Sequence, residues 1–166
     1  MNQFVLFKVQ GQSLEPTLED VIMKAIIWDF LNTIYDSREG ALYDGAKELL
    51  EKLHKKYKQA LVSSTFDVHG RIELIKSFSI WGCFDRVEIG LKTKKLFLDI
   101  CKEFGCDPCE VYIIGDNELN EIRIGNKLKM KTIWVDKRLR GSLEERLLGV
   151  NYWKKISKLS ELSNFL

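Results

Sequence analysis

The sequence contains little of several features that mark particular classes of protein. Of its 166 residues, only two are histidine, two are proline and four are cysteine. No apolar run approaches the roughly 18 to 20 residues that cross a bilayer, so we expect no membrane segment. Basic and acidic residues number 26 and 24, so no strong electrostatic field favours nucleic acid or anionic lipid as a partner. We therefore expect a globular cytoplasmic protein, either a monomer or a homodimer.

The cysteines leave two interpretations open. Cys106 and Cys109 flank an Asp-Pro dipeptide with a spacing that occurs in zinc sites and redox sites. Only one such pair is present and no histidine is near it in the sequence, which favours an ordinary turn between a helix and a buried strand. An oxidised pair in a heat-adapted protein remains the alternative.

The pattern of apolar residues predicts the fold class. From Met23 onward, short apolar runs typical of buried strands alternate with amphipathic segments, as in parallel sheets covered by helices on both faces. We expect an α/β protein: a single Rossmann-like three-layer domain at 23–166, with a central parallel sheet. The expected strands are 24–29, 59–63, 86–89, 111–114 and 132–135, and the expected helices are 44–57, 67–78, 93–104, 118–128 and a short one within 154–166.

Two further predictions concern the ends of segments. Asp44 is the expected N-cap of the first helix, and Gly105 is the expected stop of the third. Residues 1–22 form an N-terminal extension, in which Phe4–Val9 is a candidate edge strand.

Polar side chains follow three of the predicted strands at the point where each strand ends. Asp29, Ser63 and Asp116 occupy these positions. Ligands of open α/β sheets bind at the carboxyl ends of the strands, so we expect the three side chains to form a site. Two carboxylates there suit Mg²⁺, and one of them can attack phosphorus while a hydroxyl and a lysine hold the phosphoryl oxygens. Lys92 is the lysine that fits best.

These motifs resemble those of the haloacid dehalogenase superfamily, in the same order and over about 23–135. The resemblance implies that Asp29 is the nucleophile and that Mg²⁺ is held by Asp29, the backbone carbonyl of Leu31, Asp116 and Glu121. It also implies that Ser63 and Lys92 are catalytic. The implied phosphate-binding residues are Asn32, Thr33, Ser63, Ser64 and Lys92.

Two features of the resemblance leave alternatives. Lys94 and Lys95 are close enough in sequence to compete with Lys92. Phosphatases of the superfamily have a second Asp two residues after the nucleophile, as general acid, and this chain has Leu31 there. Loss of a general acid typically costs about 10²–10⁴-fold in rate. His69 is a candidate substitute, as are Tyr35 and Asp36.

The intervals between the motifs exclude a cap domain. The 34 residues from Asp29 to Ser63 and the 29 from Ser63 to Lys92 are each filled by one predicted helix and its connections. The chain is therefore most similar to the capless magnesium-dependent phosphatases. We expect a Mg²⁺-dependent phosphatase that acts on a phosphorylated small molecule or macromolecule through an aspartyl phosphate. The alternatives are a catalytically silent phosphate- or protein-binding module and, less favoured because no cap fits, a haloacid dehalogenase.

Overall fold

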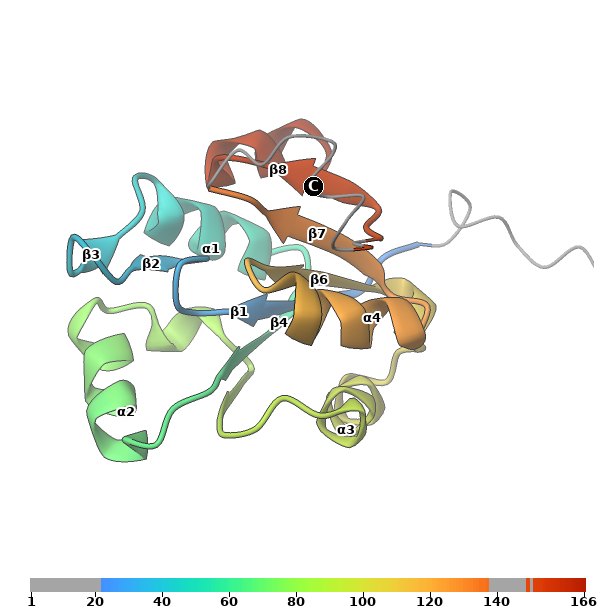
Figure 1. The fold of residues 1–166 in the computed structure, drawn as a ribbon, viewed down its shortest axis with the longest axis horizontal. Helices are drawn as coiled ribbons and strands as arrows, with labels where there is room; N and C mark the ends of the chain where they lie inside the picture. Colours follow the sequence, from blue (N-terminus) through green and yellow to red (C-terminus); the bar gives the residue numbers. More distant parts are fainter. Residues whose placement is uncertain (1–21, 138–148, 150) are drawn as a thin grey trace, which may run out of the picture.

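The computed structural model describes residues 22–137, 149 and 151–166. Its centre is a parallel sheet of six strands in the order β5-β4-β1-β6-β7-β8 (Figure 1). The strands are β1 (Ala25–Asp29), β4 (Lys58–Ser63), β5 (Arg86–Ile89), β6 (Val111–Gly115), β7 (Lys131–Val135) and β8 (Lys154–Ile156). Five of these strands were predicted within one or two residues, and the predicted α/β fold with a parallel sheet is confirmed.

Helices cover both faces of the sheet and give the predicted three layers (Figure 1). One face packs against α1 and α2, and the other packs against α3, η3 and α4. The four α-helices are α1 (Ala46–His54), α2 (Val68–Ser77), α3 (Lys94–Phe104) and α4 (Arg123–Lys127). Short helical turns complete the set: η1 (Trp81–Cys83), η2 (Pro108–Glu110), η3 (Glu118–Ile122) and η4 (Leu159–Asn164).

The central strand β1 is buried along its whole length, which explains the apolar run that precedes Asp29. Its successive side chains point to opposite faces, so Trp28 enters one core while Ile27 enters the other. The Trp28 indole N–H donates to Oε1 of Gln59 on β4 at 2.8 Å. The Gln59 amide in turn donates to the carbonyls of Leu50 and Cys83, each at 2.9 Å. This buried network connects β1 and β4 to α1, through Leu50, and to η1, through Cys83.

The caps of α3 agree with the prediction, but the cap of α1 does not. Thr93 caps α3 by accepting a hydrogen bond from the backbone N–H of Leu96, and Gly105 ends the helix with φ 66°. The prediction that Asp44 caps α1 was wrong. The N-cap is Gly45, with φ 70° and no side-chain hydrogen bond, and the positive φ explains why glycine occupies the position.

Two other elements differ from the sequence prediction. A small antiparallel hairpin, β2 (Tyr35–Asp36) with β3 (Ala41–Leu42), lies between β1 and α1 and was not predicted. The segment 154–166 contains the predicted short helix, η4, but it begins with the edge strand β8, which was not predicted. A strand is favoured there because β7 would otherwise expose an unpaired edge, which β8 covers.

The absence of a cap is confirmed for the part of the chain that contains the motifs. Between Asp29 and Ser63 the chain forms the hairpin, α1 and β4, and between Ser63 and Lys92 it forms α2, η1 and β5. No helix among the described residues has both the length and the apolar character needed to span a bilayer. The predicted edge strand Phe4–Val9 lies outside the described residues.

Candidate active site

The register of the parallel strands places the predicted site residues at one edge of the sheet. Trp28 on β1 is opposite Ile114 on β6, so Asp29 ends β1 level with the end of β6, and Asp116 follows one residue further. On the other side Asp29 is opposite Val62 of β4, so Ser63 also lies one residue further. The carboxyl ends of the three strands therefore present their polar residues together, as predicted.

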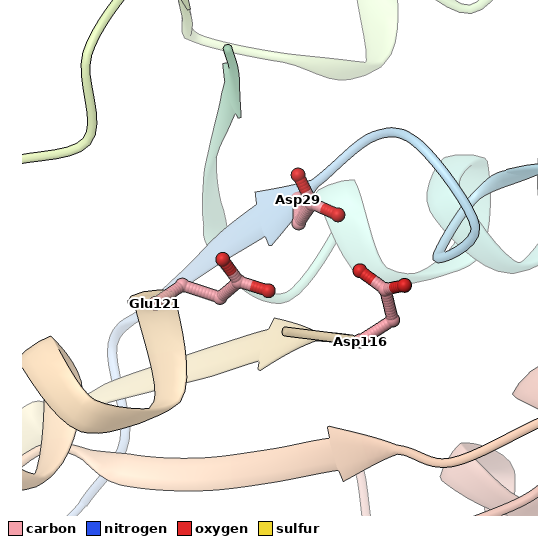
Figure 2. Close-up of side chains that lie close together, drawn as sticks. All are labelled: Asp29, Asp116 and Glu121. Carbon is pink, nitrogen blue, oxygen red and sulfur yellow. The ribbon is translucent and has the colours of Figure 1, made fainter. Parts of the chain in front are cut away.

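Three carboxylates converge at this edge (Figure 2). One oxygen from each of Asp29, Asp116 and Glu121 lies within 4.8 Å of an oxygen of each of the other two. Asp29 comes from β1, Asp116 from the loop after β6, and Glu121 from η3. Their spacing allows one divalent cation to contact more than one of them, and hard carboxylate oxygens are the ligands that Mg²⁺ prefers.

Lys92 is the lysine that reaches the carboxylates. Its Nζ donates to Oδ1 of Asp29 at 2.5 Å and to Oε2 of Glu121 at 2.8 Å, and its side chain is only 6% exposed. The competing lysines belong to α3: Lys95 pairs with Asp99 at the surface, and Lys94 is exposed. The geometry therefore selects Lys92 among the three.

Asp29 is held at both oxygens. Oδ1 accepts from Lys92, and Oδ2 accepts from the hydroxyl of Thr33 at 3.0 Å. Thr33 is fully buried, and the hydrogen bond of its hydroxyl is with Asp29. Its predicted contact with phosphate stays a prediction. Two hydrogen bonds fix the carboxylate in one orientation, which suits a nucleophile.

Glu121 is fixed in the same way, and it depends on a glycine. Its Oε1 accepts from the backbone N–H of Asn117 at 2.7 Å, while its Oε2 accepts from Lys92. A Cβ on Gly115 would lie 2.4 Å from both Cγ and Oε1 of Glu121, so only glycine leaves room for this side chain. The last residue of β6 is therefore constrained by a contact within the site.

Burial, together with repulsion between the carboxylates, raises the pKa of two of the three acids. Burial raises the pKa of Asp116 to about 7, and the charges of Asp29 and Glu121 add to the shift. Burial likewise raises the pKa of Glu121, with the Asp29 charge as the second cause. Burial alone would lower the pKa of Lys92, but the two carboxylates that it contacts outweigh burial and raise it. With three acids and one lysine, the cluster carries a net charge of about −2 when ionised, which a divalent cation would neutralise.

Ser63 has a partner that sequence reasoning missed. Nη1 of Arg71, in the first turn of α2, donates to Oγ of the buried Ser63 at 2.5 Å. The Arg71 guanidinium carbon also lies 5.3 Å from the ring centroid of Phe30, the residue after Asp29. Arginine eight residues beyond a strand end carries no recognisable sequence signal, because its reach depends on how α2 packs.

The remaining predicted site residues have other contacts. The side-chain oxygen of Asn32 accepts from the Ser37 hydroxyl at 2.7 Å. The exposed Ser64 donates its hydroxyl to the carbonyl of Gly90 at 3.0 Å. Leu31 is partly buried and forms a backbone bridge to Tyr35. Phosphate contacts by Asn32 and Ser64, and a metal contact by the Leu31 carbonyl, stay predictions.

The candidates for a substitute acid also have defined surroundings. His69 is exposed on α2, and the Tyr35 ring stacks on Phe30 with centroids 5.3 Å apart. The backbone N–H of Arg38 donates to Asp36 and lowers the pKa of that carboxyl, whereas a general acid needs a raised pKa. Asp36 is therefore a poor substitute.

The cysteines do not form a metal cluster in the described part of the chain. Cys106 and Cys109 are free thiols, and the Cys106 thiol contacts the Cys101 carbonyl at 3.7 Å. The acids at the sheet edge are the one group there with the spacing of a metal site. The turn interpretation therefore agrees with the described structure.

A family model agrees with this architecture. The model for haloacid dehalogenase-like hydrolases matches residues 7–135. No curated protein matches the sequence.

Solved structures share the fold at low sequence identity. A HAD phosphatase from Thermococcus onnurineus has a TM-score of 0.69 and 17% identity, covering 86% of this chain and 97% of that one. A 2-haloacid dehalogenase from Pseudomonas syringae has a TM-score of 0.70 and 11% identity, with coverage of 86% and 97%. YfnB of Bacillus subtilis, assigned to the HAD hydrolases and solved bound to magnesium, has a TM-score of 0.66 and 19% identity over 76% of this chain. This chain spans 57% of the length of YfnB. These structures support the fold. Because they include both a phosphatase and a dehalogenase, the fold does not identify the reaction.

Proposed function

Because this chain belongs to the haloacid dehalogenase-like hydrolases, we propose that it is a Mg²⁺-dependent phosphatase with Asp29 as its nucleophile. The observation that carries the proposal is the convergence of three carboxylates with a buried lysine at the carboxyl edge of the sheet. A net negative charge that would repel a phosphate dianion requires a cation, and the oxygen ligands suit magnesium.

The proposed ligands of the ion are the side chains of Asp29, Asp116 and Glu121 and the backbone carbonyl of Leu31. Both oxygens of Asp29 and both oxygens of Glu121 already accept hydrogen bonds, so each of these carboxylates would bind the ion through a remaining lone pair. When bound, the ion supplies charge neutralisation that lets an anionic nucleophile approach an anionic phosphoryl group.

The proposed reaction has two steps. A carboxylate oxygen of Asp29 attacks phosphorus, an O–P bond forms, and the leaving group departs with the electrons of its own bond to phosphorus. Water then hydrolyses the aspartyl phosphate, which releases inorganic phosphate and restores Asp29. Lys92 and Ser63 stabilise the charge that develops on the phosphoryl oxygens, and Thr33 keeps Asp29 aligned.

Leu31 sets the proposed substrate class. An apolar side chain replaces the acid that would protonate the leaving group, so each leaving group must depart as the anion or take its proton from water. We therefore expect turnover to favour phosphate joined to weakly basic groups, such as aryl or acyl oxygens, over alkyl phosphates.

The surroundings of the site favour a large substrate. Three apolar side chains at this edge of the sheet are exposed. They are Phe66 in the loop after β4, Leu91 just before Lys92, which is 83% exposed, and Leu119 of η3, which is 52% exposed. No cap covers them in the described chain, so a phosphorylated macromolecule or a large metabolite can reach Asp29. We propose a cytoplasmic protein that acts as a monomer or homodimer.

The test is hydrolysis of p-nitrophenyl phosphate, whose leaving group needs little protonation. We expect Mg²⁺-dependent turnover that Asp29→Asn abolishes, with thermal unfolding used to show that the variant is folded. Equal turnover by both proteins would contradict the proposal.

The second candidate function is a catalytically silent phosphate-binding module, which the leucine at position 31 favours. No turnover by either protein, together with retained binding of inorganic phosphate, would support it.

A further inference from the structure

Arg71 is placed to reach back toward the carboxyl edge of the sheet. It lies in the first turn of α2, a helix that begins after Asp67, whose side chain accepts a hydrogen bond from the backbone N–H of Gly70 at 2.8 Å. Side chains on a helix point toward its N-terminus, so the Arg71 side chain returns toward the end of β4. Figure 1 shows α2 on the same side of the molecule as the hairpin β2–β3.

Two contacts hold the guanidinium next to Ser63 and to Phe30, the residue that follows the proposed nucleophile. Nη1 donates to Ser63 Oγ at 2.5 Å, and the guanidinium carbon lies 5.3 Å from the ring centroid of the fully buried Phe30. Ser63 is the last residue of β4, and Phe30 directly follows β1. Arg71 is thus fixed between two groups that the sheet itself positions.

These contacts leave donors available. Because Ser63 Oγ accepts its hydrogen bond from Arg71, the Ser63 hydroxyl proton is free to point to another acceptor. The arginine guanidinium has five N–H donors, and the bond to Ser63 is the one that the described part of the chain shows for the guanidinium of Arg71. Burial lowers the pKa of Arg71, and the charge of Asp29 acts against that shift, so the two groups interact electrostatically.

We propose that Arg71 is a substrate-binding residue that, together with Ser63 and Lys92, holds the oxygens of a tetrahedral oxyanion at Asp29. A planar guanidinium that donates to two acceptors suits the oxygens of a phosphate group. The inference rests on the proposed function, in that it assigns the phosphoryl group to the Asp29 site. Arg71 would add a positive charge that partly offsets the negative charge of the acids at that site.

The experiment measures binding of inorganic phosphate by calorimetry, with Mg²⁺ present, to wild type and to Arg71→Met, Arg71→Lys and Lys76→Met. Methionine keeps an apolar stem over Phe30 but removes the charge and the donors. We expect the Kd for phosphate to rise about 10- to 100-fold in Arg71→Met, the range for a charged hydrogen bond, and less in Arg71→Lys. Lys76, on the same helix and 51% exposed, is the matched control and should leave the Kd unchanged.

A second comparison separates direct binding from an effect through Ser63. In a Ser63→Ala background, Arg71→Met should still weaken phosphate binding about tenfold or more if the guanidinium touches the anion. No further weakening in that background would overturn the proposal, because Arg71 would then act only by orienting Ser63. Unchanged phosphate affinity in Arg71→Met, or no phosphate binding by wild type, would overturn it as well.

The binding assay is independent of turnover. If wild type binds phosphate and Arg71→Met weakens that binding, the role of Arg71 stands even where no ester is hydrolysed. If Asp29-dependent turnover is found but Arg71→Met binds phosphate normally, the phosphatase stands and the role of Arg71 falls.

Discussion

Replacement of Lys92 by methionine tests the electrostatic balance of the site. The Lys92 ammonium contacts Asp29 at 2.5 Å and Glu121 at 2.8 Å, and all three side chains are at most 6% exposed. At an effective dielectric of about 20, each contact corresponds to roughly 6 kcal/mol of gross attraction, most of which offsets the cost of burying the charges. Removing one partner of a buried ion pair typically costs about 3–5 kcal/mol, because the other charges remain buried.

This loss is large for a domain of this size. Domains are stable by about 5–15 kcal/mol, and 1 kcal/mol lowers Tm by about 2–4 °C at 150–250 residues. We therefore expect metal-free Lys92→Met to melt roughly 6–20 °C below wild type. The control is Lys95→Met. Its ion pair with Asp99 lies at the surface, where Lys95 is 84% exposed, so we expect little change in Tm.

Magnesium should reverse part of the loss. Among the described residues, Lys92 is the cation that forms salt bridges with this cluster, so without it Mg²⁺ should bind the variant more tightly than wild type and raise its Tm more. At 100 times its Kd, an ion that binds only the folded state stabilises it by about 2.7 kcal/mol. Thermal unfolding with EDTA and with graded Mg²⁺ gives both quantities. A metal-free Tm within about 2 °C of wild type, or weaker Mg²⁺ binding by the variant, would refute the argument that Lys92 balances the acids.

Three further predictions concern the same site. Leu31→Asp should raise the rate on alkyl phosphates much more than on p-nitrophenyl phosphate, toward the roughly 10²–10⁴-fold worth of a general acid, and an equal change on both substrates in steady-state assays would argue against a missing acid. Gly115→Ala should displace the Glu121 side chain, because the added Cβ would lie 2.4 Å from it. We expect Mg²⁺ binding, measured by calorimetry, to weaken at least tenfold. Unchanged Mg²⁺ affinity would show that Glu121 is not needed to bind the ion. The pKa of Asp116 is raised from 3.8 to about 7, so a proton competes with the ion below pH 7. Mg²⁺ affinity should therefore rise by up to about tenfold per pH unit toward pH 7 and then level off. The stability of the metal-free protein should fall over the same pH range, because the folded state keeps the Asp116 proton to a higher pH than the unfolded state does. A Mg²⁺ affinity that does not depend on pH would contradict the raised pKa of Asp116.

The part of the site formed by backbone register was predictable from sequence. Asp29 and Asp116 each follow an apolar run, and parallel pairing of adjacent strands brings such positions together. Ser63 was predictable for the same reason. The geometry adds the choice of Lys92, which precedes α3, over Lys94 and Lys95, which lie within that helix.

Other features depend on packing that sequence periodicity does not report. The strands of the hairpin β2–β3 have two residues each, too few for an alternating pattern. β8 is a strand because it pairs with β7, although its Lys-rich sequence also suits a helix. The contact of Arg71 with Ser63 depends on where α2 lies, and no spacing rule predicts it.

The most direct test of the central claim is a crystal structure grown with Mg²⁺ and beryllium trifluoride, which mimics a phosphoryl group on a carboxylate. We predict one Mg²⁺ bound by the carboxylates of Asp29 and Asp116, with the beryllium attached to an Asp29 oxygen. Magnesium bound elsewhere, or beryllium trifluoride absent from Asp29 at saturating concentration, would contradict it.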